Sequence, residues 1–515
     1  MLQADKRTPE KNRRHLKAED LPNVPLVMNE ISSRFIRENM IVPIDFRNNI
    51  LKVVMANPGD KATIDAVRVA AAADVEVYST GPDILEEYIS KFYGQEPQNI
   101  NKIIEDIGGE GFEFLKDDEE DVGHLKDLAS EAPIIKLVNM LISRSVESRA
   151  SDIHIEPFED ELKIRYRIDG VLYEVESIPK KLQAAIISRI KIMAKLNIAE
   201  RRLPQDGRIK LKVAEREIDM RVSTIPVLYG ESVVMRILSK EGIVVDLDLL
   251  GFSSQMLSAF NQLIKKPNGI ILVTGPTGSG KTTTLYGALD KINSPDRKII
   301  TVEDPIEYQL NGINQIQMKP QIGLNFATTL RHVVRQDPDI IMIGEIRDLE
   351  TAEIAIQSAL TGHLVFSTLH TNDAPSAITR LIDMGLENFL LSSTIRGILA
   401  QRLVRVICPV CKEIDTSTAD REELGVLGIG SDAPLYKGRG CEKCTHTGYY
   451  GRSGIFELLV VTDEIRRLVL KDADSGQIRE AARKDGMKTL MEDGAEKIRS
   501  GVTTLSEILK VTQEA

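Results

Sequence analysis

The feature that most constrains the fold is a glycine-rich octapeptide, Gly275-Pro-Thr-Gly-Ser-Gly-Lys-Thr282, set between two patterned runs. The apolar run before it, Gly269 to Thr274, has the composition of a buried strand, and the run from Lys281 to Ile292 is helix-compatible. Glycines let the backbone curl so that several N–H groups converge on phosphate oxygens at a helix N-terminus. A strand, a phosphate loop and a helix in this order predict a nucleotide-binding α/β domain.

The loop also predicts individual roles for its residues. Lys281 is expected to reach the β- and γ-phosphates, and Thr282 is expected to ligate Mg²⁺, so ATP and Mg²⁺ are the predicted cofactors. The residues expected to contact nucleotide are Gly275, Pro276, Thr277, Gly278, Ser279, Gly280, Lys281, Thr282 and Thr283.

Three more apolar runs follow, at 298–302, 340–343 and 364–368, with helical patterns between them. This alternation predicts a parallel sheet covered on both faces, with active groups at the carboxyl ends of its strands. Glu345 ends the second run in the form of a Walker B segment, and we expect it to hold the outer shell of the magnesium or to polarise water. Either Glu303 or Glu307, which follow the first run, is expected to orient the attacking water.

Two histidines, His363 and His370, bracket the third run. Their spacing places one at each end of a strand, which argues against a joint metal site. We expect one or both to donate a hydrogen bond to the γ-phosphate.

Phosphoryl transfer develops charge that an arginine from a neighbouring domain or subunit stabilises. Arg331 and Arg335 are spaced i,i+4 in a helical pattern before Asp339, which predicts a shared helix face. The candidate arginines are Arg221, Arg236, Arg331 and Arg335.

All four cysteines of the chain fall into two CxxC pairs separated by a long loop. Two such knuckles supply a tetrahedral set of four thiolates, which predicts a closed, structural zinc site without a catalytic role. A [4Fe–4S] cluster takes the same donors, although no redox feature accompanies it here. The predicted ligands are Cys408, Cys411, Cys441 and Cys444.

A chain of 515 residues is too long for one core and suggests about three or four domains. The acidic run at 117–121 is interpreted as part of a solvated spacer, and Ser239 to Gly242 as a hinge. The expected segments are a flexible tail (1–23), an N-terminal α/β domain (24–95), a linker (96–129), a second α/β domain (130–240), the ATPase core (241–400), a tetracysteine module (401–455) and a helical extension (456–515).

The net charge of −11 argues against a sequence-independent grip on nucleic acid, which needs a basic face. No run approaches the roughly 20 apolar residues of a membrane-spanning helix, and the N-terminus has no apolar signal region. We therefore expect a cytosolic protein, or one held at a membrane by partners.

Beyond the single motifs, the chain from about residue 24 onward resembles the type II secretion and type IV pilus assembly ATPases, most closely the type II secretion ATPases (GspE). The segments that carry the resemblance are Ser151–Glu156, Arg167–Gly170, Pro204–Arg208, Arg221–Thr224, the phosphate loop, Thr301–Glu307, Gly344–Arg347 and the tetracysteine insert.

The resemblance implies a hexameric ring of RecA-like motor domains, each preceded by a PAS-like domain, with ATP bound between the two. It places Glu303 in an aspartate box, Glu345 in Walker B, and both His363 and His370 in a histidine box. The four candidate arginines match family positions that contact phosphate or the neighbouring subunit.

The implied function is an ATPase motor that powers pseudopilus assembly for protein secretion from the cytoplasmic face of the inner membrane. The implied partners are a GspL-like inner-membrane protein, bound by the N-terminal docking domain, and a GspF-like platform protein. A PilB-like pilus extension ATPase is the alternative within the family. A RecA-like nucleic-acid translocase is a remote alternative, and a non-enzymatic scaffold conflicts with the intact Lys281, Thr282 and Glu345. No cyclic-dinucleotide motif is visible in residues 1–95.

Overall fold

The structure, a computed structural model, describes residues 16–17, 21–22, 31, 35–36, 39–47, 50–71, 73–92, 122–213, 216–239, 246–416, 423–430 and 433–512. Most of the predicted tail (1–23), the acidic run at 117–121 and most of the predicted hinge lie outside these residues. The chain divides into two compact units, one made of residues 1–120 with 130–140 and one made of residues 121–129 with 141–515. The described residues of the tail pack on the first unit: Leu16 N donates to the Ser79 carbonyl oxygen at 2.9 Å, and Leu21 is buried in its core.

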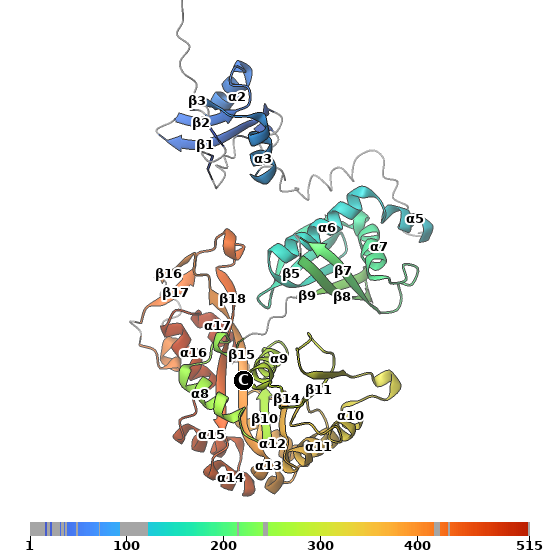
Figure 1. The fold of residues 1–515 in the computed structure, drawn as a ribbon, viewed down its shortest axis with the longest axis vertical. Helices are drawn as coiled ribbons and strands as arrows, with labels where there is room; N and C mark the ends of the chain where they lie inside the picture. Colours follow the sequence, from blue (N-terminus) through green and yellow to red (C-terminus); the bar gives the residue numbers. More distant parts are fainter. Residues whose placement is uncertain are drawn as a thin grey trace, which may run out of the picture. The chain divides into compact units, whose positions relative to one another are not determined.

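The first unit contains a small three-stranded sheet in the order β1-β2-β3. Strands β1 and β2 pair antiparallel, and β2 and β3 pair parallel through a crossover helix (Figure 1). Its core contains Val42, Leu51 and Leu85, which are all fully buried. The elements are β1 (Ile41–Arg47), β2 (Ile50–Met55), α2 (Lys61–Ala71), β3 (Asp74–Ser79) and α3 (Pro82–Phe92).

The second unit begins with a six-stranded antiparallel sheet in the order β6-β5-β4-β9-β8-β7. Alternate residues of β4, such as Ile153 and Ile155, are buried, whereas those between them are accessible. The apolar side chains of α7 are also buried, which is the pattern expected of a sheet covered on one face. The elements are α5 (Val122–Leu128), the part of α6 (Ala132–Glu147) from residue 141 onward, β4 (Ala150–Pro157), β5 (Glu161–Ile168), β6 (Val171–Pro179), α7 (Gln183–Ala194), β7 (Gln205–Val213), β8 (Arg216–Val227) and β9 (Gly230–Ser239).

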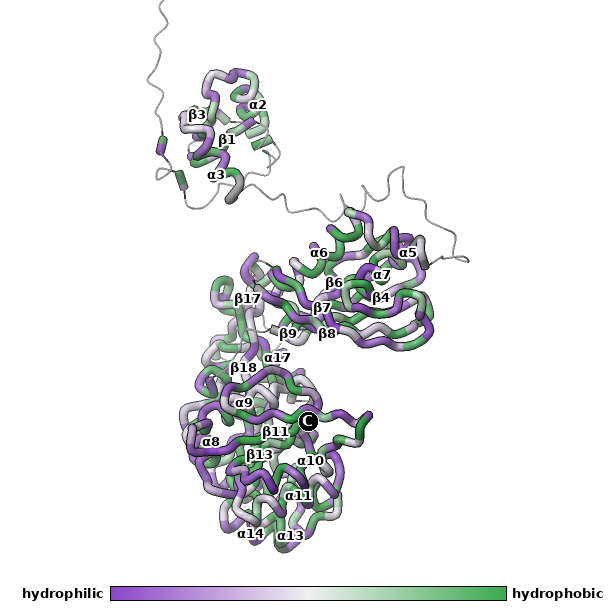
Figure 2. Tube along the Cα trace, turned by 45° about the vertical axis from the view of Figure 1, so that its right-hand side comes forward, coloured by the Kyte–Doolittle hydropathy of each residue, from purple (hydrophilic) through white to green (hydrophobic). Residues whose placement is uncertain are grey.

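The predicted ATPase core contains a seven-stranded sheet in the order β12-β11-β13-β14-β10-β15-β18, parallel except for β18. Successive residues of β10 belong to two different hydrophobic cores. Leu272 packs with side chains of α10 to α12, whereas Val273 packs with those of α8 and α9. Every residue of β11 and β13 is accordingly buried, and β13 is hydrophobic along its whole length (Figure 2). The predicted α/β fold with a parallel sheet covered on both faces is confirmed.

The elements of this sheet and its covering helices are α8 (Ser254–Leu263), β10 (Gly269–Thr274), α9 (Lys281–Ile292), β11 (Ile299–Glu303), β12 (Asn314–Gln317), α10 (Phe326–Val333), β13 (Ile340–Ile343), α11 (Leu349–Leu360), β14 (Leu364–Leu369), α12 (Pro375–Asp383), α13 (Asn388–Thr394), β15 (Ile395–Ile407) and β18 (Tyr449–Val460).

Strands β15 and β18 are longer than the others and form the base of an inserted segment, residues 408–448. The insert carries a two-stranded ribbon and the four cysteines. After β18 the chain ends in a set of helices that pack into the same core as the sheet. The remaining elements are β16 (Lys412–Asp415), β17 (Leu435–Gly438), α14 (Asp463–Leu470), α15 (Ser475–Lys484), α16 (Leu490–Arg499) and α17 (Leu505–Thr512).

Candidate active site

The phosphate loop connects the end of β10 to the start of α9, as the sequence predicts. Gly275, Gly278 and Gly280 all have positive φ, the region that favours glycine, and Gly280 caps α9 with a φ of 88°. The loop backbone and the N-terminus of α9 therefore form a site suited to an anion. Lys281 Nζ donates to the carbonyl oxygens of Gly275 at 2.7 Å and Pro276 at 3.0 Å.

The loop has the features of a cradle built for phosphate. Ser279 is almost fully buried, yet its hydroxyl makes no hydrogen bond among the described residues, so it is available to a bound group. A Cβ on Gly275 would lie 2.5 Å from the Gln401 carbonyl oxygen, so only glycine fits there. Burial lowers the pKa of Lys281 to about 8, with the positive charge of Arg402 lowering it further and Glu345 opposing the shift. A bound phosphate would raise this pKa again, because its negative charge favours the ammonium form.

Glu345 lies at the carboxyl end of β13, on the same edge of the sheet as the phosphate loop. One of its carboxylate oxygens lies 3.5 Å from His370 Nε2, and the other forms an ion pair with Arg347. Its charge also acts on Lys281. The structure therefore brings together Lys281, Glu345 and His370.

Glu303 ends the neighbouring strand β11, and only 3% of it is exposed. Both of its carboxylate oxygens accept hydrogen bonds, from the Tyr286 hydroxyl, from Thr301 Oγ1 at 2.5 Å and from Gln315 Nε2 at 3.1 Å. Burial, followed by the nearby Glu303 charge, raises the pKa of Tyr286, which keeps its hydroxyl a donor. Glu303 is thus held in a polar cluster in this state, whereas Glu307 is exposed to solvent.

The two predicted histidines lie at different edges of the sheet. His370 follows β14 on the edge of the phosphate loop, whereas His363 precedes β14, and its carbonyl accepts from Gly269 at the start of β10. His363 Nδ1 lies 2.7 Å from the Ser358 carbonyl oxygen. A six-residue strand, roughly 20 Å long, therefore separates His363 from the phosphate loop of its own chain.

The arginines before β13 do not share a helix as the i,i+4 spacing predicts. Helix α10 ends at Val333, so Arg331 lies within it and Arg335 lies beyond it. Pro338 follows closely and disfavours helical geometry at the residue before it, which explains the early end. Arg331 pairs with Glu350, and Arg335 Nη1 donates to the Arg331 carbonyl oxygen at 2.5 Å. Both side chains are exposed.

The two arginines of the preceding sheet are direct cross-strand partners, Arg221 on β8 and Arg236 on β9. On the next strands outward, Arg208 of β7 is the cross-strand partner of Arg221, and Asp152 of β4 is the cross-strand partner of Arg236. Arg236 Nε donates to Asp152 at 2.8 Å, and Arg221 Nη2 donates to the Ile306 carbonyl oxygen at 3.4 Å. The sheet therefore presents a row of three arginines, of which Arg236 and Arg208 are paired with Asp152 and Asp219.

The four cysteines converge, with one sulfur of each within 4.8 Å of the others. The Sγ–Sγ distances are 3.8 Å for Cys408–Cys441, 3.9 Å for Cys411–Cys444 and 3.7 Å for Cys441–Cys444. Four sulfurs about 2.3 Å from a tetrahedral ion lie about 3.8 Å apart, so the set fits one ion. The cysteines of a [4Fe–4S] cluster bind four separate irons and spread more widely, so the geometry disfavours that alternative.

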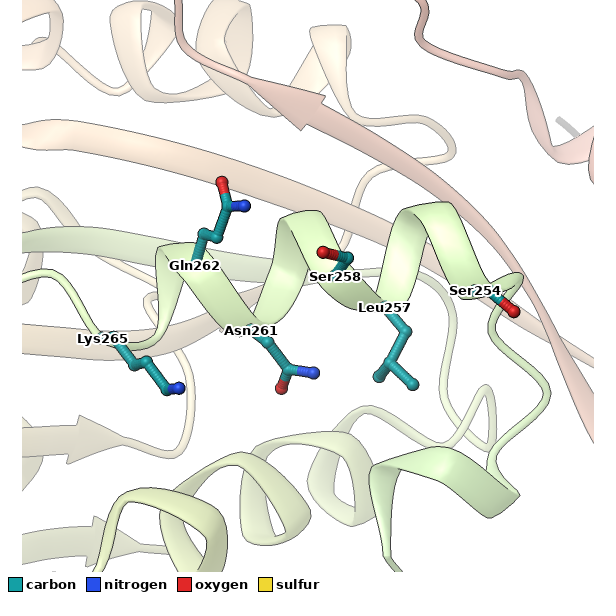
Figure 3. Close-up of a pocket in the computed structure, with 6 residues that line it drawn as sticks. All are labelled: Ser254, Leu257, Ser258, Asn261, Gln262 and Lys265. Atoms are coloured by element: carbon teal, nitrogen blue, oxygen red, sulfur yellow. The ribbon is translucent and has the colours of Figure 1, made fainter.

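A cavity of about 380 Å³ lies along α8, away from these groups. Leu257, Asn261 and Lys265 point to one side of the helix, and Gln262 points to the other (Figure 3). None of the predicted site residues lines it.

Several residues of the site have no local sequence signal. Gln401 on β15 accepts from Thr284 at 2.7 Å and lies against Gly280, whereas Arg402 lies against Gly275. Tyr286 and Gln315, which hold Glu303, are likewise distant from it in sequence. Gln401 and Arg402 reach the phosphate loop because β15 pairs in parallel with β10. This pairing places Ala400, the residue before Gln401, beside Thr274, the residue before the loop.

Comparisons with known proteins agree with this geometry. Residues 127–510 match the family model described as Type II/IV secretion system protein, and residues 12–99 match the MshEN domain. The chain is 54% identical to the Type II secretion system protein E of Xanthomonas campestris pv. campestris, covering 94% of this chain and 85% of that protein. It is 44% identical to the Type IV pilus assembly ATPase PilB of Myxococcus xanthus, covering 94% and 86%.

Among solved structures, the ATPase DotB of Yersinia pseudotuberculosis shares the fold with a TM-score of 0.56 at 21% identity, covering 78% of this chain and 98% of that chain. The phosphate loop, Glu345 and His370 all fall inside the matched family region. The chain therefore belongs to the Type II/IV secretion system protein family, and it is an ATPase of that family.

Proposed function

We propose that ATP hydrolysis at this site powers pseudopilus assembly for type II protein secretion. The observation that carries the proposal is a complete phosphate loop beside Glu345 and His370, in a chain 54% identical over nearly its whole length to a type II secretion protein E. The 44% identity to PilB makes a pilus extension motor the second candidate.

Different residues of the chain bind the phosphates and activate the attacking water. The loop amides and Lys281 hold the phosphates, and Glu345, oriented by His370, polarises the attacking water. Thr282 and Glu345 would hold Mg²⁺, which neutralises charge that develops on the phosphates. Glu303 completes the site when its polar cluster rearranges.

The proposed assembly is a hexamer in which neighbouring copies share nucleotide sites. Two observations support sharing. His363 lies at the far edge of its own sheet, and the exposed Arg331 and Arg335 bond to Glu350 and to the Arg331 carbonyl oxygen rather than to the phosphate loop. A charge-stabilising arginine from a second copy is a common solution in this chemistry. Arg221 and Arg236 supply the basic surface of the preceding domain.

The cysteine insert is proposed to hold structural Zn²⁺. Its four thiolates leave no open position, so the ion would stabilise the insert between β15 and β18 rather than take part in hydrolysis.

Location and partners follow from the proposed role. No helix among the described residues is long and apolar enough to cross a membrane. We place the protein at the cytoplasmic face of the inner membrane, with the N-terminal docking domain (24–95) on a GspL-like protein and the motor against a GspF-like platform protein. The compactness of the first unit supports a separate docking role.

The test is deletion of the gene in its own host, with complementation by the wild-type and Lys281→Ala alleles. We expect secreted enzymes to accumulate in the periplasm and pili to stay normal, with rescue by the wild-type allele alone. Loss of pili with intact secretion would overturn the proposal in favour of the pilus motor.

A further inference from the structure

The loop after β14, residues 370–374, contacts the nucleotide site and the C-terminal region through consecutive residues. It begins with His370, which faces Glu345 as described above. The next residue, Thr371, is bonded to Thr274, the last residue before the phosphate loop. Thr371 N donates to Thr274 Oγ1 at 2.8 Å, the two hydroxyls lie 2.8 Å apart, and Thr274 Oγ1 lies 3.1 Å from the Thr371 carbonyl oxygen.

The third residue, Asn372, joins the loop to Arg402, which is 5% exposed. Arg402 Nη2 donates to the Asn372 carbonyl oxygen at 3.0 Å. A Cβ on Gly275 would lie 3.0 Å from Arg402 Nη1, so the guanidinium packs directly against the start of the phosphate loop. A shift of Asn372 is therefore expected to shift Arg402, whose guanidinium packs against Gly275 and whose charge lowers the pKa of Lys281.

The last two residues reach away from the nucleotide. Asp373 accepts from Arg479 of α15 at 2.6 Å, and its other carboxylate oxygen accepts from Ser376 N at 2.7 Å. Ala374 N donates to the buried carboxylate of Glu457 on β18 at 2.8 Å. The loop thus has contacts with nucleotide-site groups at one end and with α15 and β18 at the other.

A loop of five residues spans at most about 18 Å, and anchoring at each residue leaves little freedom to move one end alone. A displacement of α15 is therefore expected to reach Glu345 through His370, which lies 3.5 Å from it, and the phosphate loop through Thr274 and Arg402. We propose that Arg479 is a positioning residue for ATP hydrolysis: through Asp373 and residues 370–374, it sets Glu345 and the phosphate loop in their hydrolysing arrangement. The inference rests on the ATPase activity alone and not on the cellular process that the activity serves.

The Arg479–Asp373 pair is a partly exposed ion pair, with the Arg479 side chain 40% accessible. Pairs of this kind contribute little to stability, so we expect the fold to stay intact when one is lost. An effect on turnover without an effect on stability separates positioning from a structural role.

The experiment measures kcat and KM for ATP, with the thermal midpoint, for Arg479→Ala and Arg479→Lys in the full chain. The matched control is Arg483→Ala, because Arg483 lies one turn further along α15 and pairs with Glu492 at 2.6 Å but does not contact the loop. Asp373→Asn serves as the partner variant, because it keeps an oxygen for Ser376 N.

We expect Arg479→Ala to lower kcat about five- to tenfold, with KM and thermal midpoint near wild type and with partial rescue by lysine. Arg483→Ala should match wild type, and combining Arg479→Ala with Asp373→Asn should lower kcat no further than either alone. Equal turnover of the Arg479→Ala and Arg483→Ala proteins, or multiplied losses in the double variant, would overturn the proposal. So would a fall in kcat that only accompanies a fall in thermal midpoint.

Discussion

Glu457 offers a prediction whose size follows from its environment. Its carboxylate lies on β18, 3% exposed, and accepts from Ala374 N at 2.8 Å. Burial raises the pKa of Glu457 to about 7, with the Asp373 charge adding to the shift and Arg479 opposing it. The folded protein therefore prefers the protonated form where the unfolded chain is ionised.

The sign of the pH dependence follows from linkage. Below a pH of about 4.5 both states carry the proton, and between about 4.5 and 7 the unfolded chain binds fewer protons than the folded one. Stability must then fall as the pH rises through this window. A shift of about 2.5 units at about 1.4 kcal/mol per unit gives an upper bound of about 3.5 kcal/mol.

Glu457→Gln removes the titration and keeps an oxygen to accept from Ala374 N. We expect its stability advantage over wild type to grow from about pH 5 to about pH 8, by an amount approaching 3 kcal/mol. In thermal unfolding this is a growing difference of about 5–10 °C for a domain of this size. A difference that stays constant with pH would refute the reasoning, because it would show that Glu457 does not titrate in this range.

Three other predictions concern the site and the insert. Tyr286→Phe removes a donor from buried Glu303 and should lower the unfolding free energy by about 1–3 kcal/mol, read by thermal unfolding; an unchanged midpoint would show that the hydroxyl does not support the carboxylate. His370→Ala should lower kcat of the isolated chain about tenfold or more, whereas His363→Ala should lower it far less. Equal losses of kcat would contradict the placement of His370 at the phosphate-loop edge of the sheet and of His363 at the opposite edge. Chelation under reducing conditions should release one Zn²⁺ per chain, measured by metal analysis, and lower the thermal midpoint with little loss of ATP affinity; purified protein without zinc would contradict the tetracysteine assignment.

The ATPase core is the part of the fold that the sequence pattern predicts best. The predicted helix from Lys281 to Ile292 has the same bounds in the structure, because the loop glycines mark its start and its apolar pattern continues to Ile292. The run at 340–343 is likewise a strand, since fully buried strands of a parallel sheet are continuously apolar.

Other elements gave weaker signals. Strand β7 has a weak sequence pattern because it is polar along most of its length, with Ile209 as its buried residue. The segment predicted as the tetracysteine module (401–455) contains the end of β15 and the start of β18, two strands of the main sheet. Buried strands lack the alternation that marks an amphipathic one, so their pattern alone does not separate them from other apolar runs.

The candidate site likewise contains residues that the sequence predicts and residues that it does not. Motifs located the phosphate loop, Glu345 and His370, because parallel strands bring their carboxyl ends to one edge. The partners of Glu303 and the contact of Arg402 with Gly275 depend on tertiary packing between distant segments, which leaves no local pattern.

The central claim, that this edge of the sheet hydrolyses ATP, is tested most directly by the ATP turnover of Glu345→Gln, measured together with its affinity for a fluorescent ATP analogue. The account predicts that turnover falls at least about a hundredfold while affinity stays within about threefold of wild type, because the amide keeps the shape of the site but cannot polarise water. Lys281→Ala should instead lose affinity as well. Wild-type turnover in the Glu345→Gln protein would contradict the account.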